Sequence, residues 1–409
     1  MLPLLVALSR ANGNTGLVNG EKRARTFVVG DVHLTRHSPP DVADALGRLL
    51  ERHPGERLVF AGDFLDLATD APNTACREAV RDVFGVHDTL RRKLAEFLDA
   101  GGEVALLGGN HDAALGAPEA VQHVAAALGV VGAAQKRIVT RPWFLREGGV
   151  HLEHGHVYDP DNAPAHPLVD GVAGLGVHFS AKFIHPTQAY RFMHANDAMP
   201  LELLITAFRW YGPRAPEVIA RYFETAFTAL AQAGPFYRGA ADRTLGMERH
   251  ARYAEDAGVP ASVVEAVFAI GGPSTFESWP RTFARLYLDR VAATLAIAAG
   301  LGALAVSGTR QNAKGWATLG LGGALMAGSW LAGGDRYGGT VVARLAAAAE
   351  RIADESDAKL VVFGHAHREA LGERYANTGS FTWPVDAPGR PYLEIVPGDR
   401  PRAVRHYLA

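Results

Sequence analysis

The sequence predicts an α/β fold that is interrupted by a large helical insertion. Between residues 26 and 112, short apolar runs alternate with amphipathic stretches, which is the pattern of strands followed by helices. Each apolar run ends in a polar turn that contains glycine. The residues between the fourth and the fifth apolar run lack such strand–turn units, and residues 160–290 predict mainly helices. A last apolar run and polar turn then follow near the end of the chain.

Five short predicted strands each end beside a polar motif. They are Thr26–Val29, Leu58–Ala61, Val104–Leu107, Val150–Glu153 and Lys359–Phe363. Amphipathic periodicity predicts helices at Asp41–Glu51 and Asp88–Ala100. The motifs after the strands are, in order, Asp31-Val32-His33, Gly62-Asp63-Phe64-Leu65-Asp66, Gly109-Asn110-His111-Asp112, His154-Gly155-His156 and Gly364-His365-Ala366-His367. Because α/β sheets place their sites at the carboxyl ends of strands, we expect these turns to meet.

Composition excludes some classes of partner. The chain has 409 residues, and its 41 basic and 43 acidic residues give a net charge of −2, so we expect no general attraction for nucleic acid. With one cysteine, Cys76, no intramolecular disulfide can form. The first ten residues place an apolar run before the first basic residue, which is the reverse of a secretory signal. We therefore expect no cleaved signal there.

The polar motifs supply the ligands that a pair of divalent ions needs. Such a site uses carboxylate and imidazole ligands, with one carboxylate bridging both ions. Asp31 and His33 are two residues apart, so on an extended segment their side chains would project to one side. A single Gly-Asp turn or a single histidine is more often structural than a ligand. Five such motifs, each at a strand end, together predict a metal centre. The candidate ligands are Asp31, His33, Asp63 as the bridge, Asn110, His154, His365 and His367.

The ordered motifs resemble those of calcineurin-like metallophosphoesterases, over residues 26–156 and 359–398. The resemblance implies a β-sandwich flanked by helices, in the layer order α/β/β/α, with two divalent ions. Manganese is our first expectation, and iron or zinc also suits a mixed oxygen and nitrogen site. One ion would be bound by Asp31, His33, Asp63 and His367, and the other by Asp63, Asn110, His154 and His365. Hydroxide held between the ions would attack phosphorus in line with the leaving group.

The resemblance also implies roles for residues that are not ligands. His111 would contact the phosphate or protonate the leaving oxygen, and Asp66 would orient it. His156 has either a role beside the ligands or substrate, or a purely structural one. The turn at residues 377–380 resembles one that often follows the last motif and shapes the site. Serine/threonine phosphatases carry Arg-Gly and Glu where this chain has Leu67-Ala68 and Asp112, which argues against a protein phosphatase.

The insertion resembles the helical lid of UDP-2,3-diacylglucosamine pyrophosphatases, which follows their His-Gly-Asp motif. Here the insertion follows His154-Gly155 and is longer. His156 stands in place of their aspartate, and His111 in place of an arginine that they generally carry. An apolar lid would suit acyl chains, so this resemblance implies a lipid-linked or amphipathic substrate.

Two uncharged stretches, Val291–Gly308 and Gly315–Gly334, are joined by a short polar segment. Their lengths match the roughly 20 residues that a helix needs to cross a bilayer core of about 30 Å. Small residues at Ala303/Ser307 and Gly320/Ala324 would let the two helices approach closely. The alternative is a buried helical hairpin in a soluble cap. Basic residues bias the flanks of the hairpin to the cytoplasmic side: the flanks carry Arg281, Arg285, Arg290, Arg336 and Arg344, and the connecting loop carries Arg310 and Lys314.

These observations divide the chain into four parts. They are a first part of the metallophosphoesterase domain (residues 1–159), a helical cap insertion (160–290), a transmembrane helical hairpin (291–334) and the second part of the domain (335–409). The sequence predicts a membrane-associated hydrolase that cleaves phosphoester or pyrophosphate bonds with two metal ions. Its catalytic domain would lie in the cytoplasm. Its substrate would be lipid-linked or another phosphorylated amphipathic molecule. One alternative is a nucleotide-type phosphodiesterase or phosphatase with a soluble substrate that the hairpin tethers. Another alternative is an inactive membrane scaffold. The complete set of candidate ligands argues against it, because a scaffold would be expected to have lost one or more of them.

Overall fold

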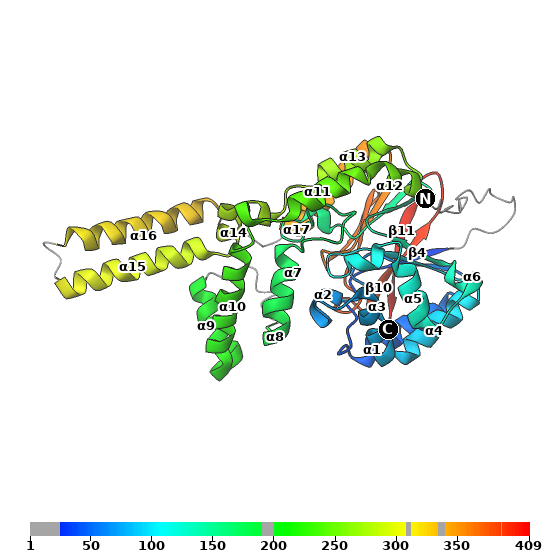
Figure 1. Ribbon diagram of the computed structural model, residues 1–409, viewed down its shortest axis with the longest axis horizontal. Helices are drawn as coiled ribbons and strands as arrows, with labels where there is room; N and C mark the ends of the chain where they lie inside the picture. Colours follow the sequence, from blue (N-terminus) through cyan, green and yellow to red (C-terminus); the bar gives the residue numbers. More distant parts are fainter. Residues whose placement is uncertain (1–24, 190–199, 308–311, 334–339, 386) are drawn as a thin grey trace, which may run out of the picture.

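The computed structural model describes residues 25–189, 200–307, 312–333, 340–385 and 387–409. Two β-sheets form the centre, helices cover their outer faces, and a helical hairpin projects from one end (Figure 1). The predicted mixed α/β class is confirmed. The N-terminal residues on which the expectation of no secretory signal depends lie outside the described residues.

The first sheet contains the three strands that precede the first three motifs. In spatial order its strands are β11 (Arg402–Leu408), β10 (Arg390–Val396), β1 (Thr26–Val29), β2 (Arg57–Phe60), β3 (Glu103–Leu107) and β4 (Ile138–Arg141). Strands β1 to β4 run parallel, β10 is antiparallel to β1, and β11 is antiparallel to β10. Because β1, β2 and β3 are parallel neighbours, their carboxyl ends lie at one edge of the sheet.

The second sheet joins two segments that are far apart in sequence. In spatial order its strands are β5 (Leu145–Glu147), β6 (Val150–Leu152), β7 (Leu360–Phe363), β9 (Tyr375–Thr378) and β8 (Glu369–Leu371). Strands β6 and β7 pair in parallel, with Val150 opposite Leu360 and Leu152 opposite Val362. The whole insertion lies between these two strands, so the motifs after them end side by side.

Alternating side chains hold four layers together. In β1, Val28 points into an apolar core between the two sheets, and its neighbours Phe27 and Val29 point to the outer helices. The outer face of the first sheet packs on helices within residues 40–128, and that of the second on helices within residues 250–270 and 340–356. The order helix, sheet, sheet, helix is consistent with a metallophosphoesterase fold. The helices beside the first sheet are α1 (Pro40–Arg52), α2 (Leu67–Asp70), α3 (Cys76–Val86), α4 (Asp88–Asp99), α5 (Ala120–Leu128) and α6 (Gly132–Gln135).

The described elements between β6 and β7 are helical. They include α7 (Leu175–Phe179), α8 (His185–Thr187), α9 (Pro200–Tyr211), α10 (Ala215–Leu230), α11 (Gly239–Glu248), α12 (His250–Ala257), α13 (Ala261–Ile270) and α14 (Trp279–Arg285). Helices α12 and α13 pack with α17 (Thr340–Ser356) over the second sheet. Helices α7 and α10 form a separate apolar cluster with Phe276 and Leu286. The insertion therefore supplies part of the outer layer as well as a helical lobe of its own.

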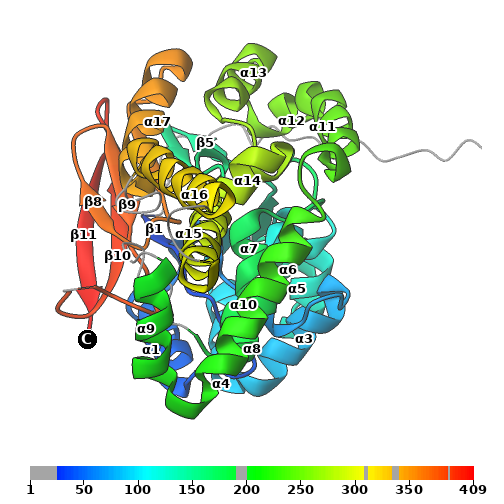
Figure 2. The same ribbon diagram turned by 90° about the vertical axis from the view of Figure 1, so that its left-hand side faces the viewer.

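Helices α15 (Leu288–Ser307) and α16 (Ala313–Leu331) form an antiparallel hairpin, which we call the arm (Figures 1 and 2). The two helices approach closely at glycines, because a Cβ atom at Gly300 would lie 2.7 Å from Leu319 N and one at Gly322 would lie 2.8 Å from Ile297 N. The sequence predicted close approach at Ala303/Ser307 and Gly320/Ala324, and this prediction was wrong, because the helices meet at other positions. Gly320 has open space around it, and Ser307 and Ala324 are exposed, because the helices turn other faces toward each other.

The arm is apolar, but only one of its two helices is long and apolar enough to cross a membrane. Among the described helices, α15 is long and apolar enough to cross a membrane. The mean hydropathy of its most apolar part is 1.7, and 22% of that part is buried inside the protein. Helix α16 is not apolar enough, because it contains Lys314 and several glycines. A transmembrane pair is therefore not shown. Large apolar side chains are nevertheless exposed along both helices: Leu295, Leu301, Val306, Trp316, Leu321, Leu325, Trp330 and Leu331.

Candidate metal centre

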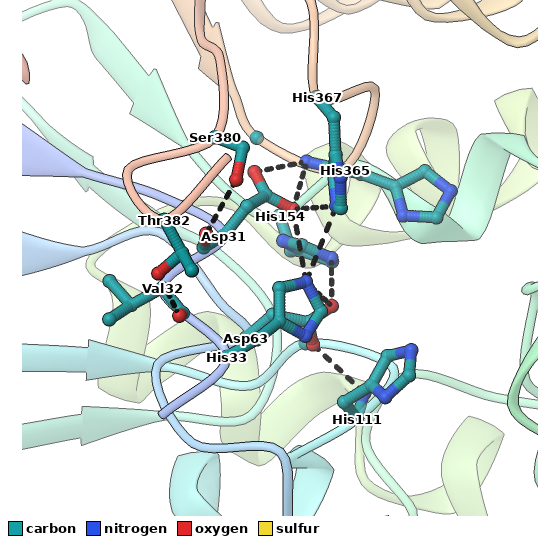
Figure 3. A network of polar contacts seen from close by, with 12 residues as sticks. Asp31, Val32, His33, Asp63, His111, His154, His365, His367, Ser380 and Thr382 are labelled. Atoms are coloured by element: carbon teal, nitrogen blue, oxygen red, sulfur yellow. Dashed lines mark hydrogen bonds and ion pairs between the residues drawn. The ribbon is translucent and has the colours of Figure 1, made fainter. Parts of the chain in front are cut away.

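The turns after β1, β2, β3, β6 and β7 converge at one edge of the two sheets (Figure 3). Asp31, Asp63 and His154 are buried there, with 0%, 1% and 1% of their surfaces exposed. Burying two carboxylates in one place is costly unless positive charge or hydrogen bonds compensate. The arrangement therefore requires partners for both carboxylates.

Asp63 lies between histidines from the two sheets. Its Oδ2 atom lies 3.6 Å from His33 Nε2 and 3.2 Å from His154 Nε2, and its Oδ1 atom accepts the backbone N–H of His111 at 2.8 Å. His154 donates from Nδ1 to the carbonyl oxygen of Ala61 at 2.9 Å, which leaves Nε2 to face Asp63. No side chain fits at position 109, because a Cβ atom there would lie 2.1 Å from Asp63 Oδ1.

Asp31 is the centre of a second set of contacts. Its Oδ1 atom lies 3.1 Å from His367 Nε2 and 3.9 Å from His33 Nε2. The two imidazole Nε2 atoms of His33 and His367 are 3.3 Å apart. The carboxylate also accepts the backbone N–H of His365, and Ser380 donates its hydroxyl to the carbonyl oxygen of Asp31 at 3.0 Å (Figure 3). The first and last motifs of the chain therefore meet at Asp31.

Five of the predicted ligands occupy the left-handed backbone region. Their φ angles are 52° at Asp31, 47° at His33, 50° at Asp63, 64° at His365 and 50° at His367. This conformation costs about 1–3 kcal/mol for a residue with a side chain, and it concentrates at functional sites. The expectation that Asp31 and His33 lie on an extended segment was therefore wrong. Tight left-handed turns, not the pleat of a strand, bring their side chains together.

The donor set fits divalent ions. Three groups have ligand atoms that all lie within 4.8 Å of one another: Asp31, His33 and His367; His33, Asp63 and His111; and Asp31, Asp63 and His154. Asp31, His33 and Asp63 each belong to two of these groups, so the three groups form one continuous cluster of donors. Buried carboxylates beside imidazole nitrogens form the mixed oxygen and nitrogen set that binds manganese, iron or zinc. Burial lowers the pKa of His33 to about 4 against the opposing charge of Asp63, so this ring is neutral and able to bind a cation.

Asn110 and His365, the remaining predicted ligands, sit on either side of His154. Asn110 Oδ1 lies 3.0 Å from His154 Nε2, and the rings of His154 and His365 have centroids 5.1 Å apart. The ring of His365 is held from elsewhere, because its Nε2 atom lies 3.0 Å from Asp159 Oδ2. This contact leaves Nδ1 of His365 available to an ion.

Sequence reasoning missed Asp159. The run Asp159-Pro160-Asp161-Asn162 begins three residues after His156, the last residue of the His-Gly-His motif, and it was visible in the sequence. Such a composition is also that of an ordinary turn, so it carried no signal for the site by itself.

His111 lies beside the carboxylate that was predicted to orient it. Its Nδ1 atom is 2.7 Å from Asp66 Oδ1. Burial alone would lower the pKa of His111, but the carboxylates of Asp66, Asp63 and Asp112 outweigh it and raise this pKa to about 10. The ring is therefore protonated near neutral pH, and Nε2–H is its free donor. His111 also belongs to the group of possible ligands with His33 and Asp63, so the alternative role for His111 is to bind a metal ion.

Three further residues shape the site. Asp112 accepts the backbone N–H groups of Asp63, Leu65 and Gly109 at 2.9–3.1 Å, so it fixes two of the turns. His156 packs against His154, with ring centroids 5.3 Å apart, and burial together with the neighbouring histidines holds its pKa well below the ordinary value. Trp383 is 45% exposed and lies 5.4 Å from the ring of His33, at the rim of the site.

The turn at residues 377–380 adopts the shaping role that was predicted for it. The side-chain amide of Asn377 donates to the carbonyl oxygen of Gly364 at 2.6 Å, and its carbonyl oxygen accepts from Gly379 N at 3.0 Å. This turn thereby supports the backbone that carries His365 and His367.

Comparison with known proteins agrees with this geometry. The family model described as calcineurin-like phosphoesterase matches residues 24–193. The match contains the first four motifs and ends before Gly364–His367, which the second sheet brings to the same site. A search among curated proteins found no relative that matches the chain. The chain therefore carries a calcineurin-like phosphoesterase domain, the domain of a metal-dependent phosphoester hydrolase.

Proposed function

We propose that this protein hydrolyses phosphoester or pyrophosphate bonds with two divalent ions, of which manganese is the first candidate. The position of Asp63 between His33 and His154 carries this proposal, because one carboxylate then faces two sets of donors. The first ion would be bound by Asp31, His33, Asp63 and His367, and the second by Asp63, Asn110, His154 and His365.

The chain's own residues would orient the substrate and move the proton. When bound, two divalent ions would stabilise charge on phosphoryl oxygens and would lower the pKa of the attacking water molecule. Asp66 occupies Nδ1 of His111, so the proton on Nε2 is free for the phosphate or the leaving oxygen. Burial would raise the pKa of Asp63, but His154, His111 and His33 hold it well below its ordinary value. The bridging group is therefore a carboxylate throughout the working pH range.

We further propose that the arm binds the protein to a membrane and that the substrate is lipid-linked or otherwise amphipathic. Helix α15 has 20 residues, which corresponds to about 30 Å, the thickness of a bilayer core. Its exposed apolar side chains, with those of α16, would lose contact with water on insertion. Both ends of the arm lead back to one domain, because β6 precedes it and the adjacent strand β7 follows it. Both ends therefore lie on one side, and the basic residues of the flanks favour the cytoplasm.

The main alternative is a soluble substrate of nucleotide type. Trp383 supports it, because an exposed indole beside the proposed ligands His33 and His367 can stack on a flat leaving group. The inactive scaffold is disfavoured, since each predicted ligand side chain is present and lies in or beside the site.

Activity assays on the purified full-length chain test the proposal. The panel should contain a phosphomonoester, a phosphodiester and a nucleoside diphosphate derivative, each with and without an acyl chain and each with manganese, iron or zinc. We expect metal-dependent hydrolysis that is fastest for an acylated substrate in detergent or lipid. Faster turnover of the acyl-free nucleotide would support the soluble-substrate alternative. No hydrolysis of any substrate with any metal would contradict the proposed activity.

A further inference from the structure

We propose that Asp159 and Asn162, at the start of the helical insertion, are positioning residues for the second metal ion. This inference rests on the proposed two-ion centre and deepens it. Asp159 is almost fully buried, and its Oδ2 atom lies 3.0 Å from His365 Nε2. Because a ligating histidine binds the metal through one nitrogen and is held through the other, this contact turns Nδ1 of His365 into the ligand atom.

Asn162 has the matching role for Asn110. The side-chain amide of Asn110 donates from Nδ2 to Asn162 Oδ1 at 3.2 Å. An asparagine side chain can be turned either way, and this contact fixes its amide nitrogen on the side of Asn162. Asn110 Oδ1 then points toward His154, 3.0 Å from Nε2, and is free to bind the ion.

The two positioning residues are also bonded to each other. Asn162 donates from Nδ2 to Asp159 Oδ2 at 2.7 Å, so the same oxygen accepts from both Asn162 and His365. A single unit therefore orients two of the four proposed ligands of the second ion. Of the proposed metal ligands, Asn110 and His365 are the two that these side chains contact among the described residues. The ion bound by Asp31, His33 and His367 should therefore not depend on this unit.

The insertion holds this unit in place. Thr275 donates its backbone N–H to the carbonyl oxygen of Pro160 at 2.7 Å, and Asp161 forms an ion pair with Arg285. Gly176 permits close packing, because a Cβ atom there would lie 2.2 Å from Asn162 Oδ1. Asp161 thus fastens the unit to the insertion, and Asp159 and Asn162 reach the metal centre.

Metal titration of the full-length chain tests the inference. The metal-free protein is titrated with Mn²⁺ by calorimetry, and spectra of electron paramagnetic resonance distinguish a coupled pair of ions from single ions. We expect two ions in the wild type. In Asp159→Ala and in Asn162→Ala, the affinity for the second ion should fall by about 10–100-fold while that for the first is unchanged. Asp159→Asn, which keeps one acceptor oxygen, should lose less.

Asp161→Asn is the matched control for Asp159→Asn, because both variants replace a carboxylate with an amide and the two positions are two residues apart. It removes the charge that pairs with Arg285 but keeps the backbone N–H that donates to Asp159. We expect a lower melting temperature with both ions bound as in the wild type. An equal loss of the second ion in this variant would overturn the positioning role, since docking of the insertion would then explain the effect. Unchanged affinity for both ions in Asp159→Ala would also overturn it. Fewer than two ions in the wild type would instead contradict the proposed two-ion centre.

Discussion

The Nε2 atom of His154 lies 3.2 Å from Asp63 Oδ2, although the two residues follow strands of different sheets. Asp63 follows β2 of the first sheet, and His154 follows β6 of the second. Their contact places the bridging candidate at the junction of the two sheets. The site therefore exists only when both sheets are packed together.

Replacing the bridging carboxylate should abolish hydrolysis without unfolding the protein. We expect Asp63→Asn to keep its backbone conformation, because asparagine tolerates the left-handed region, and to keep an acceptor for the N–H of His111. It removes the charge that both ions share. Metal analysis should show about two ions per chain in the wild type and fewer in the variant. Asp82→Asn, a control at a side chain that is 38% exposed, should keep both ions, and full activity of Asp63→Asn would contradict the site assignment.

Removing the proton donor should separate catalysis from metal binding. His111→Ala should lower kcat by about 10²–10⁴-fold, the typical contribution of a general acid, with metal content near that of the wild type. Asp66→Asn should give a smaller loss, because it weakens the contact that orients the ring. His37→Ala serves as the control, since that side chain is 72% exposed. If His111→Ala also loses an ion, His111 is a ligand.

The arm should be inserted in a membrane with its tip on the outer side. With Cys76 replaced by serine, Lys314→Cys near the tip should react with an impermeant thiol reagent added to intact cells. Arg281→Cys, at the base of the arm and exposed, should react only after the membrane is opened. Extraction of the wild type into buffer without detergent, or equal labelling of both cysteines in intact cells, would favour a soluble arm.

A buried histidine pair should make the insertion sensitive to acid. His166 and His250 have Nε2 atoms 2.8 Å apart, and burial together with the positive charges of His250, Arg243 and Arg249 lowers the pKa of His166 to about 3. The nearby carboxylate of Glu265 opposes the effect of burial, which lowers the pKa of His250.

Because the unfolded chain takes up this proton near pH 6.5 and the folded chain does not until about pH 3, folding stability should fall as pH drops between these values. Between pH 7 and pH 5 the loss from His166 should be about 1–2 kcal/mol. Denaturant unfolding at both pH values should show a smaller loss in His166→Gln than in the wild type, with His37→Gln as the control. Equal losses in His166→Gln and the wild type would mean that His166 is already protonated in the folded state.

Local sequence was sufficient to find the strands that carry the motifs. The predicted strands at residues 26–29, 58–61, 104–107, 150–153 and 359–363 correspond to β1, β2, β3, β6 and β7 within one residue at each end. Apolar runs that end in glycine-containing turns are local signals, so no tertiary information was needed. Strands β10 and β11 were not predicted, because charged residues interrupt the apolar residues of both strands and neither has such a run.

The sequence by itself determined which residue types stand at each strand end, since a carboxylate or imidazole in a tight turn is specified locally. Only the tertiary structure decided how they are used. The left-handed turns at Asp31 and His33, the contact of Asp159 with His365 and the register of the arm all depend on pairs of segments that are distant in the chain. The parallel pairing of β6 with β7 across the whole insertion brings those segments together, and a contact of that kind leaves no periodic signal in the sequence of either partner.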